Sequence, residues 1–277
     1  MKPLIILGAP RSGTNILRDT LCSSKFFTTW DCDEINYIWR VGSALNNSDE
    51  LDIKSLNKSK RKYIVNSFLK IWKGLALKNQ NIYVVEKTCA NCLRLAYVFE
   101  VFPKAKFIYI KRNPYDSIYS IKERWKGKTS NNYLLKKAKY IPKIDLPYYA
   151  IRYLNHRLKQ KISLHKELPT WGPRFKNIDV FRKKNSLIET CAKQWSECTK
   201  KVENDIDILR SKGLQIFHLT YEDFVSHPEK CLAEINVFLG LHNKFNNFKV
   251  NTINNKSLGK GKNNLTELEK KLISKII

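Results

Sequence analysis

The segment from Leu4 to Asn15 constrains the fold more than any other part of the chain. Leu4–Leu7 is an apolar run with the length of a buried strand, and it ends at Gly8. A loop bounded by Gly8 and Gly13 follows, and the pattern beyond it is helical. Strand, glycine-bounded loop and helix N-terminus together bind phosphate, because backbone N–H groups converge on the anion and the helix dipole attracts it. We expect a phosphate-binding loop here; a plain tight turn is the alternative.

The residues after the second glycine indicate what kind of phosphate ligand this loop takes. The spacing of Gly8 and Gly13 is that of a P-loop. A nucleotide triphosphatase then needs Lys and Ser or Thr, which bind the β- and γ-phosphates and Mg²⁺. Thr14 and Asn15 stand there instead, and the cation of the loop is Arg11. This pattern predicts a phosphate-rich ligand that is handled without a metal ion.

Alternating apolar and helical segments predict the architecture. The chain has 277 residues, 43% of them hydrophobic and 27% charged, which is the composition of a globular protein with a full core. Predicted strands cover Leu4–Leu7, Ile82–Val85, Phe107–Ile110 and Leu214–Leu219. Predicted helices cover Ile16–Leu21, Ile64–Leu77, Cys92–Phe102, Ser117–Trp125, Ile188–Leu209 and Glu229–Leu239. Fully apolar strands alternating with helices favour an α/β fold with three layers, α/β/α, around a central parallel sheet.

We expect one domain over residues 1–277, with an insertion at about 126–187. The insertion mixes basic, aromatic and proline residues, a composition typical of lids and acceptor-binding loops; a structural filler role is the alternative. The polar stretch Asn46–Lys62 is expected to be a surface connection.

The net charge of +26 favours anionic ligands, and the cysteines favour a reducing compartment. Nucleic acid, an anionic membrane, acidic glycans and a multiply phosphorylated cofactor all fit such a charge. No apolar stretch has the roughly 18–20 residues of a membrane span, and the short N-terminal run is no signal peptide, so we expect a cytoplasmic protein. Cys89 and Cys92 form the one C-x-x-C pair among seven scattered cysteines. A redox pair or half of a zinc site is possible there, but no second pair has metal-ligand spacing, so reduced thiols are expected.

A second motif predicts a separate grip on one phosphate. Phe107–Pro114 reads Phe-Ile-Tyr-Ile-Lys-Arg-Asn-Pro, a strand that ends in a basic turn, and a helix opens directly after it. Arg112 leaves the carboxyl end of the strand and Ser120 lies about two turns into the helix, so a guanidinium and a hydroxyl can hold a single phosphate. A helix cap beside a surface arginine is the alternative. Two such loops in one chain suggest a ligand with phosphates at two ends.

Together, the two motifs resemble the nucleotide-binding motifs of sulfotransferases. The segments are Gly-Ala-Pro-Arg-Ser-Gly-Thr from Gly8 and Ile-Lys-Arg-Asn-Pro-Tyr-Asp-Ser-Ile-Tyr-Ser up to Ser120. The resemblance implies a nucleotide-kinase-like sulfotransferase fold and the use of 3′-phosphoadenosine 5′-phosphosulfate (PAPS), which leaves as PAP. It also implies that Arg112 and Ser120 hold the 3′-phosphate. The residues it assigns to the 5′-phosphosulfate are Arg11, Ser12, Gly13, Thr14 and Asn15.

Further stretches are similar to the same family. Glu86-Lys-Thr resembles its Glu-Lys-Thr-Pro, with Cys89 in place of proline, and Trp171-Gly-Pro-Arg with Cys191–Trp195 resembles the bacterial and protein-tyrosine sulfotransferase branch. Leu219-Thr-Tyr-Glu-Asp-Phe resembles a strand end that would bring Tyr221 near the adenine. The stretch from Ser257 to Lys262 looks like a diverged form of the loop that closes over the 3′-phosphate. The resemblance implies that its members Ser257, Lys260 and Lys262 contact the cofactor.

The catalytic assignments rest on this resemblance and on the position of one carboxylate. Lys87 resembles the lysine that stabilises charge on the leaving oxygen, and Arg11 would act on the same charge from the loop; Lys87 could instead pair with Glu86. No histidine lies where the small-molecule branch has its base, whereas the other branch has a carboxylate beyond the P-loop. Glu34 is our candidate for the general base, with Asp33 and Asp31 as alternatives. A structural role as an acid at a helix N-terminus is the other interpretation of Glu34.

The resemblance therefore implies a PAPS-dependent sulfotransferase. Its acceptor would be a hydroxyl, of a carbohydrate or another biomolecule; a glycan fits the basic and aromatic insertion, but so do a lipid headgroup, a tyrosine and a small metabolite. We expect no metal and no nucleic-acid partner. A P-loop kinase would share the phosphate loop but needs a lysine and a Mg²⁺ site. A non-catalytic basic module would explain the charge but not two phosphate loops at strand ends.

Overall fold

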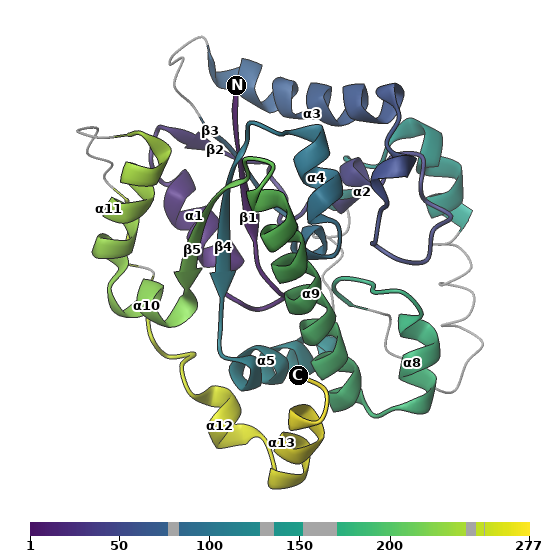
Figure 1. The fold of residues 1–277 in the computed structure, drawn as a ribbon, viewed down its shortest axis with the longest axis vertical. Coiled ribbons are helices and arrows are strands. Elements are labelled where there is room, and N and C mark those ends of the chain that lie inside the picture. Colours follow the sequence, from purple (N-terminus) through teal and green to yellow (C-terminus); the bar gives the residue numbers. More distant parts are fainter. Residues whose placement is uncertain (77–82, 128–135, 152–170, 242–247, 252) are drawn as a thin grey trace.

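A sheet of parallel strands forms the centre of the computed structural model (Figure 1). The model describes all residues except 77–82, 128–135, 152–170, 242–247 and 252. The strands are β1 (Lys2–Leu7), β2 (Phe27–Thr28), β3 (Tyr83–Lys87), β4 (Lys106–Lys111) and β5 (Gln215–Thr220). Their order is β2-β3-β1-β4-β5, and every pairing is parallel. The predicted α/β class and parallel sheet are confirmed. Strand β1, which precedes the predicted phosphate-binding loop, lies in the middle of the sheet, between β3 and β4.

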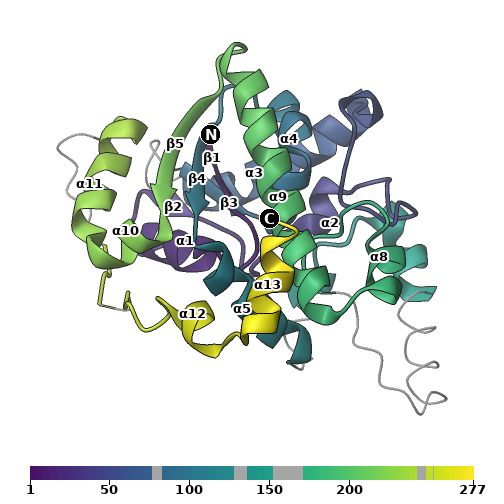
Figure 2. The same ribbon diagram turned by 60° about the horizontal axis from the view of Figure 1, so that its bottom comes forward.

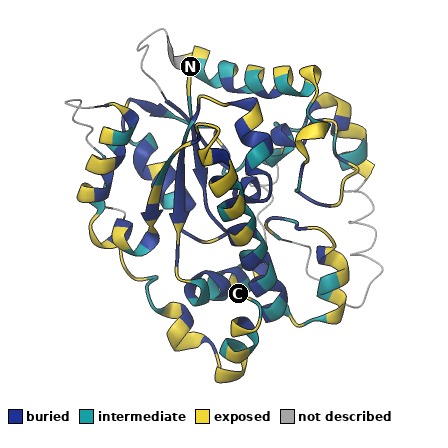
Figure 3. Ribbon diagram, in the orientation of Figure 1, coloured by how far each residue is buried: buried dark blue, intermediate teal, exposed yellow. Residues whose placement is uncertain are grey.

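Helices cover both faces of the sheet, as the fully apolar strands require. Along β1, Leu4 and Ile6 pack into one hydrophobic cluster, while Ile5 and Leu7 pack into the other. All four side chains are buried, and Figure 3 shows the same dark core running through the strands. Alternate side chains of a strand point to opposite faces, so a strand with helices on both sides buries both sets of side chains, as β1 does.

The two helical layers contain different parts of the chain (Figure 1). The first layer has α1 (Thr14–Cys22), α10 (Tyr221–Ser226) and α11 (Pro228–Leu239). The second has α3 (Lys58–Ala76), α4 (Leu95–Val101) and α9 (Leu187–Arg210). Shorter elements lie around them: α2 (Asn36–Trp39), α8 (Ile178–Lys184), and the 3₁₀ turns η1 (Ile53–Ser55), η2 (Cys89–Leu93) and η3 (Lys143–Asp145).

The C-terminal helices close the end of the sheet where the strands terminate. Figure 2 shows α12 (Lys260–Asn264) and α13 (Glu267–Ser274) beside α5 (Pro114–Lys126) and the first half of α9. A third hydrophobic cluster joins them, in which Ile121 and Trp125 of α5 meet Ile188 of α9 and Ile273 of α13. The last part of the sequence thus packs against the helix that follows the second predicted phosphate motif.

Two expectations on local structure are wrong in detail. The predicted helix Cys92–Phe102 is interrupted, because Arg94 (φ −154°) separates η2 from α4. The stretch Asn46–Lys62 is more than a surface connection. Asp49 is buried and pairs with the guanidinium of Arg40 at 2.6 Å. Among the described residues, no helix is long and apolar enough to cross a membrane.

Candidate active site

The loop between β1 and α1 has the geometry of an anion cradle. Arg11 and Gly13 both adopt positive φ, 68° and 90°, which turns the chain sharply into the helix. Gly13 is required for space as well, because a Cβ there would lie 2.3 Å from Cδ2 of the Tyr221 ring. Within the described part of the chain, no side chain caps α1 and no acidic residue lies in its first turn. Its leading N–H groups are therefore available to an anion, with the helix dipole in support.

The two predicted phosphate-binding segments meet in the structure. Nε of Arg11 donates to Oγ of Ser120 at 2.9 Å, although these residues are 109 positions apart. Nη1 of Arg112 donates to the carbonyl oxygen of Arg11 at 3.0 Å. The loop after β1 is thus hydrogen-bonded to the turn and helix after β4 through three of the predicted phosphate-binding residues, Arg11, Arg112 and Ser120.

Arg112 also joins the C-terminal loop to this site. Its Nη2 donates to the carbonyl oxygen of Ser257 at 2.6 Å, and its guanidinium carbon lies 4.3 Å from the centre of the Tyr221 ring. The side chain is buried, and its Nε has no hydrogen-bond partner in the described structure. The sequence interpretation gave this guanidinium to a phosphate alone. Its two terminal nitrogens in fact hold two loops together, which leaves Nε as the unsatisfied donor.

Asp116 is a residue of this site whose role the sequence interpretation missed. Its carboxylate accepts N–H groups from Gly259 at 2.8 Å and from Gly261 at 2.6 Å, which fixes the start of α12 on α5. Gly261 lies so close that a Cβ would be 2.3 Å from the backbone of Tyr115. Lys260 and Lys262, which flank Gly261 in the sequence, are exposed. The glycine spacing in the C-terminal stretch was the available signal for this close approach.

Glu34 and Lys87 form the second part of the site. Nζ of Lys87 lies 3.0 Å from Oε1 of Glu34, and the backbone N–H of Cys89 donates to the same oxygen at 3.3 Å. Nζ of Lys137, from the predicted insertion, lies 3.9 Å from Oε2. Consecutive strand residues point to opposite faces, so Lys87, at the end of β3, points away from the side chain of Glu86 and meets Glu34 instead.

The charges around Glu34 set its protonation. Burial by itself would raise the pKa of Glu34, but the positive charges of Lys87 and Lys137 and the hydrogen bonds to its carboxylate outweigh burial and hold that pKa below its ordinary value. Glu34 in turn raises the pKa of Lys87 against the opposing effect of burial. At neutral pH the two groups therefore form an ionised pair.

The neighbouring acidic residues point elsewhere. The carboxylate of Asp33 lies 3.5 Å from Nη2 of Arg18, and that of Asp31 accepts a hydrogen bond from Tyr140. Of the three predicted carboxylates, Glu34 is the one that contacts Lys87 at the carboxyl end of the sheet.

The cysteine pair lies close to the phosphate loop as free thiols. Cys89 and Cys92 are both buried and unpaired, and Sγ of Cys89 lies 3.7 Å from Oγ1 of Thr14. Burial raises the pKa of Cys89 to about 12, so it stays protonated. Among the residues that the structure describes, no three His, Cys, Asp or Glu side chains gather as metal ligands would.

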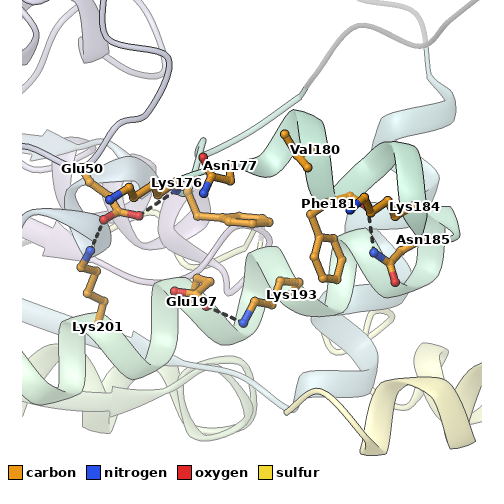
Figure 4. A pocket seen from close by; sticks show the side chains of 11 residues that line it. Glu50, Lys176, Asn177, Val180, Phe181, Lys184, Asn185, Lys193, Glu197 and Lys201 are labelled. Atoms are coloured by element: carbon orange, nitrogen blue, oxygen red, sulfur yellow. Dashed lines mark hydrogen bonds and ion pairs between the residues drawn. The ribbon is translucent and has the colours of Figure 1, made fainter.

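A cavity of about 500 Å³ between α8 and α9 is separate from these loops (Figure 4). Glu50, Phe181 and Lys184 are among its lining residues, and none of the predicted site residues lines it. Two of its lysines are paired, Lys193 with Glu197 at 2.7 Å and Lys201 with Glu50.

The comparisons with known proteins agree with the two motifs. A family model described as "Sulfotransferase family" matches residues 3–168, while no curated protein matches the chain. A sulfotransferase from Alicyclobacillus acidocaldarius is 13% identical with a TM-score of 0.50, covering 100% of this chain and 94% of that one. Sulfotransferase STF9 from Mycobacterium avium is 12% identical with a TM-score of 0.50, covering 86% and 64%. Mouse sulfotransferase SULT7A1, solved in complex with PAP, is 13% identical with a TM-score of 0.45, covering 99% and 82%.

At 12–13% identity, the two solved structures with a TM-score of 0.50 show a common fold alone, whereas the family model covers more than half of the chain. With its predicted phosphate-binding loop after β1 and its second basic motif after β4, this chain belongs to the sulfotransferase family.

Proposed function

We propose that this protein transfers a sulfuryl group from PAPS to an acceptor hydroxyl. The observation that carries the proposal is the direct bonding of the two phosphate motifs, Arg11 to Ser120 and Arg112 to Arg11. A ligand with phosphates at both ends of a nucleoside fits loops that are adjacent but distinct. PAPS supplies an activated sulfuryl group, and the chain supplies its orientation and the stabilisation of charge, as in phosphoryl transfer.

Each part of this donor has a group of residues in the chain that would hold it. The 5′-phosphosulfate would be held at the N-terminus of α1 by Arg11, Ser12, Gly13, Thr14 and Asn15. The free N–H groups there and the absence of an acidic residue support this. The 3′-phosphate would lie near Ser120 and Arg112, whose buried Nε has no hydrogen-bond partner among the described residues. Tyr221 would contact the adenine. The C-terminal loop would close the site through Ser257, Lys260 and Lys262.

Lys87 and Glu34 are the proposed catalytic pair. The buried ammonium of Lys87 would stabilise negative charge on the leaving oxygen, with Arg11 on the loop side. Glu34 would accept the proton of the acceptor hydroxyl. A carboxylate whose pKa is held low is a weak base while Lys87 is bonded to it. The proposal therefore requires Lys87 to turn from Glu34 toward the leaving oxygen when the donor is bound.

Thermal stabilisation by nucleotides tests the donor assignment. PAP should raise the melting temperature strongly, since a ligand at about 100 times its Kd adds roughly 2.7 kcal/mol. ATP with Mg²⁺ lacks a 3′-phosphate and should have a weak effect. Equal shifts from both nucleotides would favour the P-loop kinase, and salt-sensitive glycan binding without any response to PAP would favour the basic module.

Paired substitutions test the base. Glu34→Gln should lower kcat by about 10²–10⁴-fold, as expected for a lost general base. Asp33→Asn is the matched control, because that carboxylate faces Arg18 instead of Lys87. Activity retained in Glu34→Gln but lost in Asp33→Asn would move the base by one residue.

The acceptor class can be found with labelled PAPS. Incubation with libraries of glycans, lipid headgroups, tyrosine peptides and small alcohols, followed by mass spectrometry, identifies the product. We expect a hydroxyl-bearing acceptor, with carbohydrates first among those to be tried because the 126–187 segment combines basic and aromatic residues.

A further inference from the structure

Glu86 is a buried carboxylate with no place in the proposed chemistry. It precedes Lys87 on β3, is fully buried, and uses both of its oxygens. Oε1 accepts a hydrogen bond from Oγ1 of Thr88 at 2.5 Å, and Oε2 accepts one from Nδ2 of Asn91 at 2.8 Å. A buried carboxylate is tolerated in a protein when hydrogen-bond donors satisfy its oxygens, as they do here. The remaining question is what this second carboxylate, which is buried, does directly beside Lys87.

Thr88 and Asn91 each make a second hydrogen bond, and that bond indicates which of their atoms faces Glu86. Oγ1 of Thr88 accepts a hydrogen bond from the backbone N–H of Ile35 at 3.2 Å, and its single hydrogen is left for Oε1 of Glu86 when that carboxyl is ionised. Oδ1 of Asn91 accepts a hydrogen bond from Nε of Arg94 at 2.9 Å, so the amide nitrogen of Asn91 faces Glu86. Two short chains of hydrogen bonds therefore end on the same carboxylate.

One chain continues to the segment that carries Glu34. Nη2 of Arg94 donates to Oδ1 of Asn36 at 2.6 Å, and Nδ2 of Asn36 donates to the buried carboxylate of Asp49 at 3.0 Å. The backbone of Ile35 is held by the other chain. The two residues that directly follow Glu34 are thus both tied to Glu86, one through the main chain and one through the side chain.

We propose that this set of hydrogen bonds, here called the Glu86 network, positions Glu34 for catalysis. Its members are Glu86, Thr88, Asn91, Arg94, Asn36 and Asp49. The inference rests on the proposed function, because it treats Glu34 as the base. Lys87 and Glu86 are consecutive on β3, so the same strand end carries the partner of Glu34 and the anchor of the segment after it. None of the members is assigned a direct contact with the reacting groups.

The benefit of such a network follows from the precision that proton transfer needs. The segment from Asp31 to Ile35 has no helix or strand to hold it, and the ion pair with Lys87 must be able to open. When that bond is broken, the ties at Ile35 and Asn36 remain. Misplacement of a reacting group by about 1 Å can cost roughly 100-fold in rate.

Thr88 offers a matched pair of variants for the test. Thr88→Val keeps the shape but removes the hydroxyl, which leaves the N–H of Ile35 and one oxygen of Glu86 without partners. Thr88→Ser keeps the hydroxyl. We expect Thr88→Val to lower kcat by about 10- to 100-fold with little change in the KM for PAPS or in the thermal shift by PAP, and Thr88→Ser to restore most of the activity.

Amide hydrogen exchange supplies a readout that does not depend on turnover. Exchange at Ile35 should be at least about tenfold faster in Thr88→Val than in Thr88→Ser, because the N–H loses its acceptor. Asn36→Ala breaks the other tie without touching β3, and it should give the same loss of kcat with unchanged KM. This second variant keeps the test valid where Thr88→Val folds poorly.

Several outcomes would overturn the proposal. One is a kcat within twofold of wild type for both Thr88→Val and Asn36→Ala. Another is an equal loss of kcat in Thr88→Val and Thr88→Ser. A third is the same rate of amide exchange at Ile35 in Thr88→Val as in Thr88→Ser. Failure of the proposed function looks different, because the wild-type protein itself would then neither bind PAP nor transfer sulfuryl groups, while the exchange difference at Ile35 would still appear.

Discussion

Replacing Glu34 should destabilise the fold as well as stop catalysis, because of its buried partner. The side chain of Lys87 is 3% exposed, and among the described residues its ion-pair partner is Glu34. Glu34→Gln leaves that ammonium buried without a counter-charge. Breaking one side of a buried ion pair costs about 3–5 kcal/mol. At roughly 2–4 °C per kcal/mol for large domains, the melting temperature should fall by on the order of 10 °C.

The pH dependence of this destabilisation has a definite sign. Burial lowers the pKa of Lys87 and Glu34 raises it above the ordinary value of 10.5. In Glu34→Gln the negative charge of Glu34 is gone, and burial then holds the pKa of Lys87 below 10.5 in the folded state. Below pH 10.5, Lys87 therefore binds fewer protons in the folded state than in the unfolded state. Stability then rises with pH. The deficit of the variant relative to wild type should therefore shrink as the pH rises from neutral toward 10.

A double-mutant cycle measures the coupling. Lys87→Met should cost less than Glu34→Gln, because Glu34 is 21% exposed and keeps Lys137 and the N–H of Cys89 nearby. The double variant Glu34→Gln/Lys87→Met should recover most of the stability lost in Glu34→Gln while remaining inactive. Circular dichroism during thermal and urea unfolding gives all four values. A melting temperature of Glu34→Gln within 2 °C of wild type, or a double variant as unstable as the sum of the singles, would refute the reasoning.

Three further predictions concern the phosphate loops and the buried carboxylates. Asp116→Asn replaces one acceptor of the α12 backbone by a donor, and should weaken PAP binding by roughly 10- to 100-fold in calorimetry; an unchanged Kd would mean that the loop is held by other contacts. Gly13→Ala should abolish PAP binding, because the new Cβ strikes Tyr221 and the residue has a φ of 90°; a normal melting shift with PAP would contradict this. Burial raises the pKa of Glu86 to about 7, so its contribution to the free energy of unfolding should fall as the pH rises from 4.5 to 7. Urea unfolding of wild type and Glu86→Gln measures this; a difference in unfolding free energy that stays constant between pH 4.5 and 7 would contradict it.

The sequence predicted those parts of the molecule that depend on local pattern. The run Leu4–Leu7 was predicted as a strand covered on both sides, and the structure buries all of it. The helix expected over Ile188–Leu209 is α9, Leu187–Arg210, and the capping box formed by Ser186 and Glu189 explains its start. Such elements carry their own signals, since apolar periodicity and cap residues are adjacent in sequence.

The parts that the sequence did not predict depend on contacts between distant segments. Nothing near Asp116 indicates that it binds the N–H groups of Gly259 and Gly261, because the partners are backbone atoms far along the chain. Lys137 reaches Glu34 from the insertion, where no motif marks it. The sequence placed Glu34 ahead of Asp31 and Asp33 as the candidate base, but it did not predict the contacts that distinguish the three carboxylates. Each carboxylate has a different cation or hydroxyl as its neighbour, and side-chain direction in an irregular segment has no period to follow.

The arrangement of the site suggests how its parts act on one another. Arg112 bonds to the carbonyl oxygens of Arg11 and Ser257, and Arg11 bonds to Ser120, so the phosphate loops and the C-terminal loop share one set of guanidinium contacts. Oγ of Ser120 accepts the bond from Arg11 and keeps its own hydrogen, so in the proposed function it would donate that hydrogen to a 3′-phosphate without releasing Arg11. The remote phosphate would then hold Ser120, and through it Arg11, in place near the 5′ end, where the proposed reaction develops negative charge. Binding energy far from the reacting atoms can contribute to rate in this way.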